Sequence, residues 1–142
     1  MSWLRIRDPS LVDTLGKWPA EWWLIYDDTD AREHWWCRWL KPGFRHVLAL
    51  RRDGRVWVAV KPTTGFVDIE VLRTDATPWQ LFPSATVQRV VALREANTIR
   101  SRLFVGPLTC VEVCKALLGI RAWWLRTPWQ LHRFCGRRLQ CR

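Results

Sequence analysis

The fold is decided by the stretch Phe44-Arg45-His46-Val47-Leu48-Ala49-Leu50-Arg51-Arg52-Asp53-Gly54-Arg55-Val56-Trp57-Val58-Ala59-Val60. Two runs rich in apolar and β-branched residues flank Asp53-Gly54, the pair preferred in a two-residue type I′ turn. The stretch therefore predicts a β-hairpin. Counting outward from this turn gives the expected cross-strand pairs, which are Arg52 with Arg55, Leu50 with Trp57, Leu48 with Ala59, and His46 with Lys61.

Further strands are expected on both sides of the hairpin. Short apolar or alternating runs predict them at Glu21–Tyr26, Phe66–Leu72, Val87–Leu93 and Leu103–Val105. Start and stop residues predict helical segments at Ala31–Leu40, at Cys110–Leu118 before Gly119, and from Thr127-Pro128 to about Cys135.

The order of these elements predicts an α+β domain: an antiparallel sheet of about four to five strands packed against a helix that carries cysteine. We expect one domain over residues 1–142, with 1–20 an irregular N-terminal arm and 136–142 a basic C-terminal tail. The pentapeptide Thr-Pro-Trp-Gln-Leu occurs at Thr77–Leu81 and again at Thr127–Leu131. Because the flanking residues differ, we interpret it as a reused helix start and not as a domain duplication.

The charge of the chain is +10 and is unevenly distributed. Seven of the thirteen acidic residues lie in residues 1–33, whereas six arginines and no acid occur from Arg121 onward. This pattern predicts an anionic partner, either a cell envelope or lipid surface or an acidic protein surface, with nucleic acid as an alternative. The first residues have no apolar signal region, and no long apolar run exists, so we expect synthesis in the cytoplasm and no membrane span.

The cysteines suggest chemistry as well as packing. Thr109 and Glu112 form a capping-box pattern that places Cys110 on the first turn of its helix. At that position the free backbone N–H groups and the helix dipole favour a thiolate. Cys114 lies one turn later and is expected in the core. Five cysteines without a disulfide-like spacing indicate reduced thiols.

A thiolate needs a base, and His46 on the first hairpin strand is the best placed of the three histidines. His34 and His132 lie in helical segments and are weaker candidates. A strand histidine followed some sixty residues later by a helix-starting cysteine resembles the circularly permuted papain-like hydrolases, which are related to NlpC and include lecithin:retinol acyltransferase. The similarity rests on the strand around His46 and on Thr109-Cys110-Val111-Glu112-Val113.

This resemblance implies that Cys110 is the nucleophile, that His46 is the base, and that the backbone N–H of Cys110 helps to bind the oxyanion. It further implies acyl transfer to water, cleaving an amide in a peptide or in peptidoglycan. The small size and the lack of an export signal would suit a phage or prophage protein delivered by a virion. In this family a polar group orients the histidine, but the expected pairing places Lys61 opposite His46. A lysine cannot accept a hydrogen bond from the imidazole, so Thr63, Thr64, Asp68 or a backbone carbonyl is expected to take this role.

Two functions without catalysis stay open. A division of the twelve tryptophans between the core and an interface favours a catalytically silent structural protein of a larger assembly. Anion-binding arginines among the last tryptophans instead favour a nucleic-acid-binding module. These arginines are Arg121, Arg126, Arg133, Arg137 and Arg138. Because no Cys-x-x-Cys pair accompanies His34 and Cys37, we expect no metal, and we expect no other cofactor.

Overall fold

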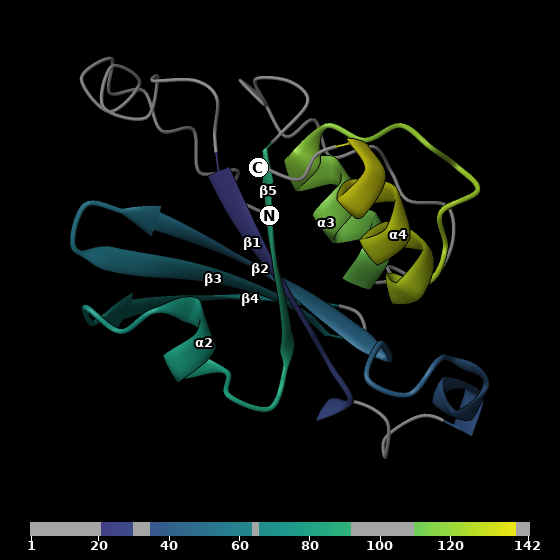
Figure 1. The fold of residues 1–142 in the computed structure, drawn as a ribbon, viewed down its shortest axis with the longest axis horizontal. Coiled ribbons are helices and arrows are strands. Elements are labelled where there is room, and N and C mark those ends of the chain that lie inside the picture. Colours follow the sequence, from purple (N-terminus) through teal and green to yellow (C-terminus); the bar gives the residue numbers. More distant parts are fainter. Residues whose placement is uncertain (1–20, 30–34, 64–65, 92–109, 139–142) are drawn as a thin grey trace.

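The computed structural model describes residues 21–29, 35–63, 66–91 and 110–138, and in it five antiparallel strands form one sheet (Figure 1). The strand order is β4-β3-β2-β1-β5. The strands are β1 (Glu21–Asp27), β2 (His46–Asp53), β3 (Val56–Thr63), β4 (Phe66–Arg73) and β5 (Thr86–Val91). Three α-helices accompany them, namely α2 (Pro78–Leu81), α3 (Cys110–Leu118) and α4 (Pro128–Arg138). The predicted α+β class with an antiparallel sheet is therefore confirmed.

The β2–β3 hairpin forms as predicted, but its register differs by two residues. Asp53 pairs with Val56, so the two residues of the turn are Gly54 and Arg55 and not Asp53 and Gly54. Gly54 has a φ of +57°, and a glycine at the first turn position is what a type II′ turn requires. The predicted pairing of His46 with Lys61 is wrong for this reason. Because side chains alternate with a period of two, the shift leaves each of them on its predicted face.

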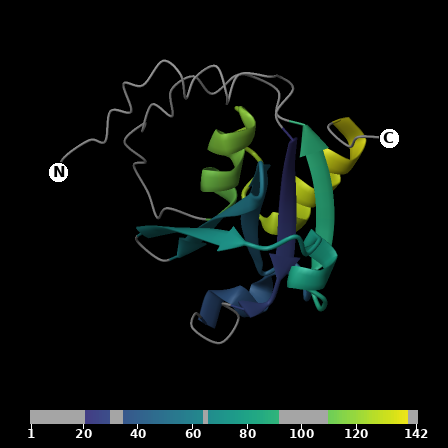
Figure 2. The same cartoon turned by 90° about the vertical axis from the view of Figure 1, so that its left-hand side faces the viewer.

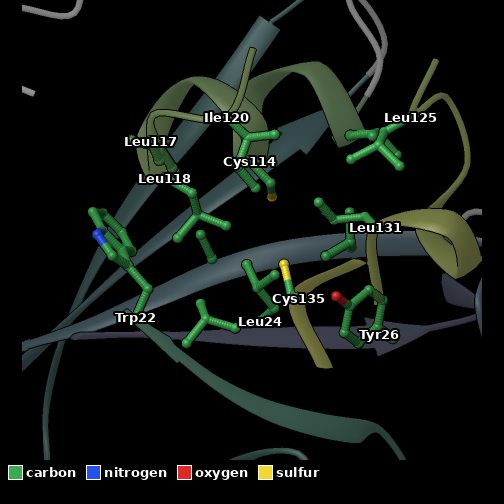
Figure 3. Packing of buried hydrophobic residues seen from close by; sticks show 14 of the residues in the cluster. Trp22, Leu24, Tyr26, Cys114, Leu117, Leu118, Ile120, Leu125, Leu131 and Cys135 are labelled. Atoms are coloured by element: carbon green, nitrogen blue, oxygen red, sulfur yellow. The ribbon is translucent and has the colours of Figure 1, made fainter. Parts of the chain in front are cut away.

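The sheet carries a hydrophobic cluster on each face, and Figure 2 shows α3 and α4 lying apart from α2. On the α3–α4 face the two helices pack over buried strand residues, which are Trp22, Leu24, Tyr26, Val47, Ala49, Val60 and Val90 (Figure 3). On the other face, here the α2 face, a smaller cluster packs against the α2 segment and consists of Ile25, Leu48, Leu50, Trp57 and Ala59. The sheet is therefore buried on both faces near β1 and β2.

The helix boundaries agree with the start and stop residues of the sequence. Helix α3 spans the predicted range, and Gly119 follows it with a φ of +70°. Helices α2 and α4 both begin in the repeated pentapeptide. In each, the threonine hydroxyl accepts a hydrogen bond from the glutamine N–H, and the glutamine side chain accepts one from the threonine N–H. The interpretation of the repeat as a helix start is confirmed.

Some predicted boundaries change. Helix α4 continues past Cys135 to Arg138, so residues 136–138 of the expected tail are helical. The expected helix at Ala31–Leu40 is a 3₁₀ helix at Trp35–Trp39, labelled η2. The expected arm at 1–20, residues 30–34, the strand at Leu103–Val105, and residues 139–142 lie outside the described part of the chain.

Candidate functional site

Cys110 is the first residue of α3, and its side chain packs against the cluster on the α3–α4 face. Its predicted cap, Thr109, lies outside the described residues. Glu112, the other half of the predicted capping box, places Oε1 2.6 Å from Nζ of Lys115. The predicted nucleophile is thus a partly buried thiol at a helix start, bordering the core.

Two further thiols lie deeper in the same cluster, and the side chains of Cys114 and Cys135 are both labelled in Figure 3. Burial raises the pKa of Cys114 well above its ordinary value, and the neighbouring thiols of Cys110 and Cys135 add to this. Burial also raises the pKa of Cys135 to about 12. Both side chains are therefore protonated, apolar packing groups at neutral pH.

Both ring nitrogens of His46 face oxygen atoms of neighbouring strands. Nε2 lies 2.9 Å from the carbonyl oxygen of Pro62 on β3, and Nδ1 lies 3.4 Å from Oδ1 of Asp27 on β1. The β2–β3 pairing runs only from Asp53 and Val56 to Ala49 and Val60, so the contact with Pro62 joins the two strands beyond this ladder. His46 therefore bridges three adjacent strands from a buried position.

The Asp27 carboxylate beside His46 is ionised more readily than an ordinary aspartate. Burial of Asp27 opposes its ionisation, but hydrogen bonds from the side chain of His46 and from Thr29 outweigh burial and lower its pKa. Asp27 is thus an acceptor at neutral pH. The Pro62 carbonyl can only accept, so Nε2 of His46 is the donor in that hydrogen bond, while Nδ1 lies on the side of the ring that faces the Asp27 carboxylate.

Of the expected orienting residues, Thr63 directly follows Pro62 on β3, and Lys61 and Asp68 lie on β3 and β4. Lys61 forms an ion pair with Glu70 on β4 and pairs in register with Asp68. Asp68 is exposed on that edge strand, and Thr63 pairs with Phe66 at its start. Lys61 does not lie directly opposite His46, because the hairpin register differs from the expected one by two residues. Thr64 lies outside the described residues.

His46 and Cys110 are placed on different faces of the sheet. Alternation along β2 places His46 on the α2 face, together with Leu48 and Leu50, whereas Cys110 packs into the α3–α4 face. To take the thiol proton, Nε2 would have to give up the Pro62 carbonyl and act as an acceptor. The arrangement suits strand bridging, and the catalytic pairing of Cys110 with His46 stays a prediction.

A second arrangement lies in the loop between α3 and α4. Trp123 and Trp124 are 73% and 56% exposed, and their rings form a T-shaped pair with centroids 6.2 Å apart. The N–H of Leu125 donates to the carbonyl of Ala122, so the two tryptophans occupy the centre of a β-turn. Residues 121–126, here the tryptophan turn, begin and end with an exposed arginine.

The base of the tryptophan turn is fixed by a buried ammonium group. Nζ of Lys115 donates to the carbonyl oxygens of Ala122 and Leu125, each at 3.0 Å, and it contacts the carboxylate of Glu112. These three acceptors match the three N–H donors of a lysine. Ala122 and Leu125 are themselves buried. The turn is thus anchored at both ends while its two indoles face solvent.

The other predicted anion-binding residues lie on α4, which follows the tryptophan turn in the sequence. Helix α4 buries Leu131 and Cys135 and leaves its arginines exposed, which are Arg133, Arg137 and Arg138. At the start of α4, Nζ of Lys41 lies 3.2 Å from the centre of the Trp129 ring. This cation–π contact joins α4 to the segment that follows η2. Within η2, Trp35 and Trp39 are 73% and 79% exposed.

Comparison with protein-family models, with curated proteins and with solved structures found no match to this chain. Within the described ranges, no three His, Cys, Asp or Glu side chains gather as a metal site would require. Nor does that part of the chain contain a helix long and apolar enough to cross a bilayer.

Sequence reasoning missed two residues of these sites. Asp27 lies one residue beyond the expected strand Glu21–Tyr26, and only the non-local pairing of β1 with β2 brings it to His46. Lys115 was overlooked although a signal existed. It lies four residues after Val111 and three before Leu118, which are both buried, so its position falls on the inner side of α3.

Proposed function

We propose that this protein is a binding protein that docks onto an anionic partner through the tryptophan turn. The observation that carries the proposal is the exposure of Trp123 and Trp124 on a turn whose base Lys115 holds in place. Turn centres usually carry small or polar residues such as Gly, Asn or Asp, because these suit the backbone and solvent. Two exposed indoles on an anchored turn instead resemble the aromatic anchors of binding sites.

The charge around the turn supports an anionic partner. Arg121 and Arg126 flank the two indoles, and from Arg121 to the last residue the chain has no acid. Helix α4, which follows the turn in the chain, carries three more exposed arginines. Tryptophan and arginine are the side chains most enriched at binding hot spots, and uncompensated positive charge attracts anionic surfaces at long range.

The test measures binding to three anionic probes, which are phosphatidylserine-containing vesicles, poly(dT) and polyglutamate. We expect W123A/W124A and R121A/R126A to weaken binding to at least one probe. The matched controls are W79A, an exposed tryptophan on α2, and R55A/R73A, two exposed arginines at the hairpin turn. If binding to all three probes is the same in W123A/W124A as in W79A, the tryptophan turn is not a binding site and the proposal is wrong.

A cysteine hydrolase of the permuted papain-like fold is the second candidate, and the contact that favours it is that of Asp27 with Nδ1 of His46. A carboxylate at this position would orient the histidine, which is the role that the resemblance assigned to a polar group. Catalysis would then use Cys110 as nucleophile on an amide, in a peptide or in peptidoglycan, after Nε2 had left the Pro62 carbonyl. A virion-associated enzyme fits this activity.

Thiol labelling separates the two candidates. Cys141 is replaced by serine so that it does not react with the label. In this C141S variant, an activated Cys110 should react with iodoacetamide well below the pH at which an ordinary thiol reacts, and H46Q should abolish this reaction at low pH. Ordinary reactivity of Cys110, unchanged by H46Q, would overturn the hydrolase. Binding to the anionic probes does not depend on this result.

A further inference from the structure

We infer that the anionic partner of the tryptophan turn is the surface of a lipid bilayer with acidic headgroups. This inference rests on the proposed binding function and names its partner. Three features of the described residues carry it: the shape of the turn, the orientation of its rings, and a second group of exposed tryptophans at the same end of the molecule.

The turn presents its indoles outward from the protein. Trp123 and Trp124 are the two central residues of the turn, and the flanking Ala122 and Leu125 are buried, so the tryptophans form its tip. A projecting pair of side chains can bind either a deformable surface or a preformed pocket. The interfacial region of a bilayer accepts apolar side chains without a preformed pocket, whereas a protein partner would need a matching cavity.

The ring geometry argues against nucleic acid. The planes of Trp123 and Trp124 lie at 86° to each other. Proteins that bind single strands stack successive bases on aromatic faces that follow the strand, and two perpendicular rings do not provide such a series. Insertion among lipid headgroups sets no such condition, and tryptophan is enriched at this depth of the bilayer.

The second group of tryptophans belongs to η2. Trp35, Trp36 and Trp39 are 73%, 45% and 79% exposed. In Figure 1, η2 and the loop between α3 and α4 both lie toward the right-hand end of the long axis. Lys41 connects the two regions through its contact with Trp129 at the start of α4. Several indoles at one end of the molecule fit a broad interfacial plane better than a single pocket.

The charge completes the match. Arg121 and Arg126 border the indoles, and Arg38 and Lys41 are exposed on the η2 side. Arginine and lysine at a bilayer surface pair with lipid phosphates and acidic headgroups, and each contributes to attraction over about one Debye length. The indoles would therefore enter the headgroup region while the cations remain at the phosphate level.

The experiment compares vesicles of phosphatidylcholine mixed with phosphatidylserine, vesicles of phosphatidylcholine alone, poly(dT) and polyglutamate. The full chain should bind the mixed vesicles most tightly. At low salt, we expect R121A/R126A to lose about thirtyfold in vesicle affinity and W123A/W124A about tenfold. W79A and R55A/R73A should bind as the unaltered chain does. Lipids with brominated acyl chains should quench tryptophan fluorescence, and W123F/W124F should remove part of this quenching.

The outcomes separate the partner from the function. If W123A/W124A weakens binding to poly(dT) or polyglutamate but the mixed vesicles are not bound, the bilayer is the wrong partner and the binding function stands. Vesicle binding without quenching by brominated lipids would also overturn the inference, because the indoles would not enter the bilayer. If no probe distinguishes W123A/W124A from W79A, both proposals are wrong. A near-ultraviolet circular dichroism spectrum of each variant checks that the fold is retained.

Discussion

Asp27 and His46 are paired residues of β1 and β2, and the Asp27 carboxylate lies 3.4 Å from Nδ1 of the imidazole. On its other side the ring reaches the Pro62 carbonyl, beyond the point where the β2–β3 ladder ends. The predicted catalytic histidine therefore has a structural task, because it holds three strands together at one end of the sheet. Its buried position makes this contact relevant to stability.

Asp27→Asn should change how stability depends on pH. The pKa of Asp27 is lowered in the folded protein, so the carboxylate contributes stability above the ordinary aspartate pKa of about 4, and this is lost as pH falls through the folded pKa. We expect D27N to cost about 1 kcal/mol at neutral pH and less in acid. Urea unfolding at neutral and acidic pH measures this. The exposed Asp68→Asn serves as the control, and an equal cost of D27N at both pH values would contradict the prediction.

His46→Ala should destabilise the fold far more than Lys61→Ala. Removing the imidazole leaves the buried Pro62 carbonyl without its side-chain donor and leaves the Asp27 carboxylate with the Thr29 N–H but without its imidazole partner, which costs about 2–3 kcal/mol. Lys61 forms a surface ion pair with Glu70, and such pairs contribute about 0–1 kcal/mol. Chemical unfolding of the two variants gives both values. Similar losses would mean that His46 does not bridge the strands.

The sequence predicted the elements better than their register. Alternation and the Asp53-Gly54 pair were sufficient for the hairpin, but glycine fits both a type I′ and a type II′ turn, and the choice shifts the pairing by two residues. That shift separates Lys61 from His46. The helix starts were predictable because the cap residues are local, as the two Thr-Pro-Trp-Gln-Leu segments show.

Non-local contacts were beyond sequence patterns. The approach of Asp27 to His46 depends on the pairing of β1 with β2 across η2, which no short motif encodes. The sequence shows that tryptophans are numerous but not which of them are exposed, because the exposure of Trp123 and Trp124 depends on how their loop is anchored. Lys115 anchors it by reaching carbonyls in the following loop, and a single charged residue in an apolar helix pattern does not reveal its acceptors.

Lys115→Met should loosen the tryptophan turn and lower stability. Methionine has a similar volume but no donor, so the carbonyls of Ala122 and Leu125 lose their partner and the Glu112 carboxylate loses its counter-ion. We expect a loss of about 2–3 kcal/mol in the free energy of unfolding. Glu112→Gln should cost less, about 1 kcal/mol, because its side chain is partly exposed and the carbonyls stay bound. Amide hydrogen exchange should show faster exchange at Leu125 in K115M alone. Unchanged exchange there would mean that Lys115 does not anchor the turn.

Tyr26 is the single tyrosine of the chain, so its ionisation can be followed directly by ultraviolet absorbance. Its hydroxyl donates to Oε1 of Gln88 at 2.8 Å, and Nε2 of Gln88 donates to the carbonyl of His132 on α4. Burial raises the pKa of Tyr26 well above its ordinary value, and the nearby Cys135 and Cys114 add to this. The folded protein therefore keeps the phenol protonated above about pH 10, where the unfolded chain ionises, and stability should fall as pH rises beyond that value.

We expect the tyrosinate absorbance to appear together with alkaline unfolding and not before it. Tyr26→Phe should cost about 1–2 kcal/mol at neutral pH, because it leaves the buried Gln88 oxygen without its donor. The same variant should lose stability less steeply in alkali, since it has no phenol to ionise in the unfolded state. Circular dichroism recorded alongside absorbance makes the comparison. Tyrosinate that forms near pH 10 while the spectrum of the folded protein is unchanged would show that solvent reaches Tyr26 and that the Tyr26–Gln88–His132 chain does not close this side of the core.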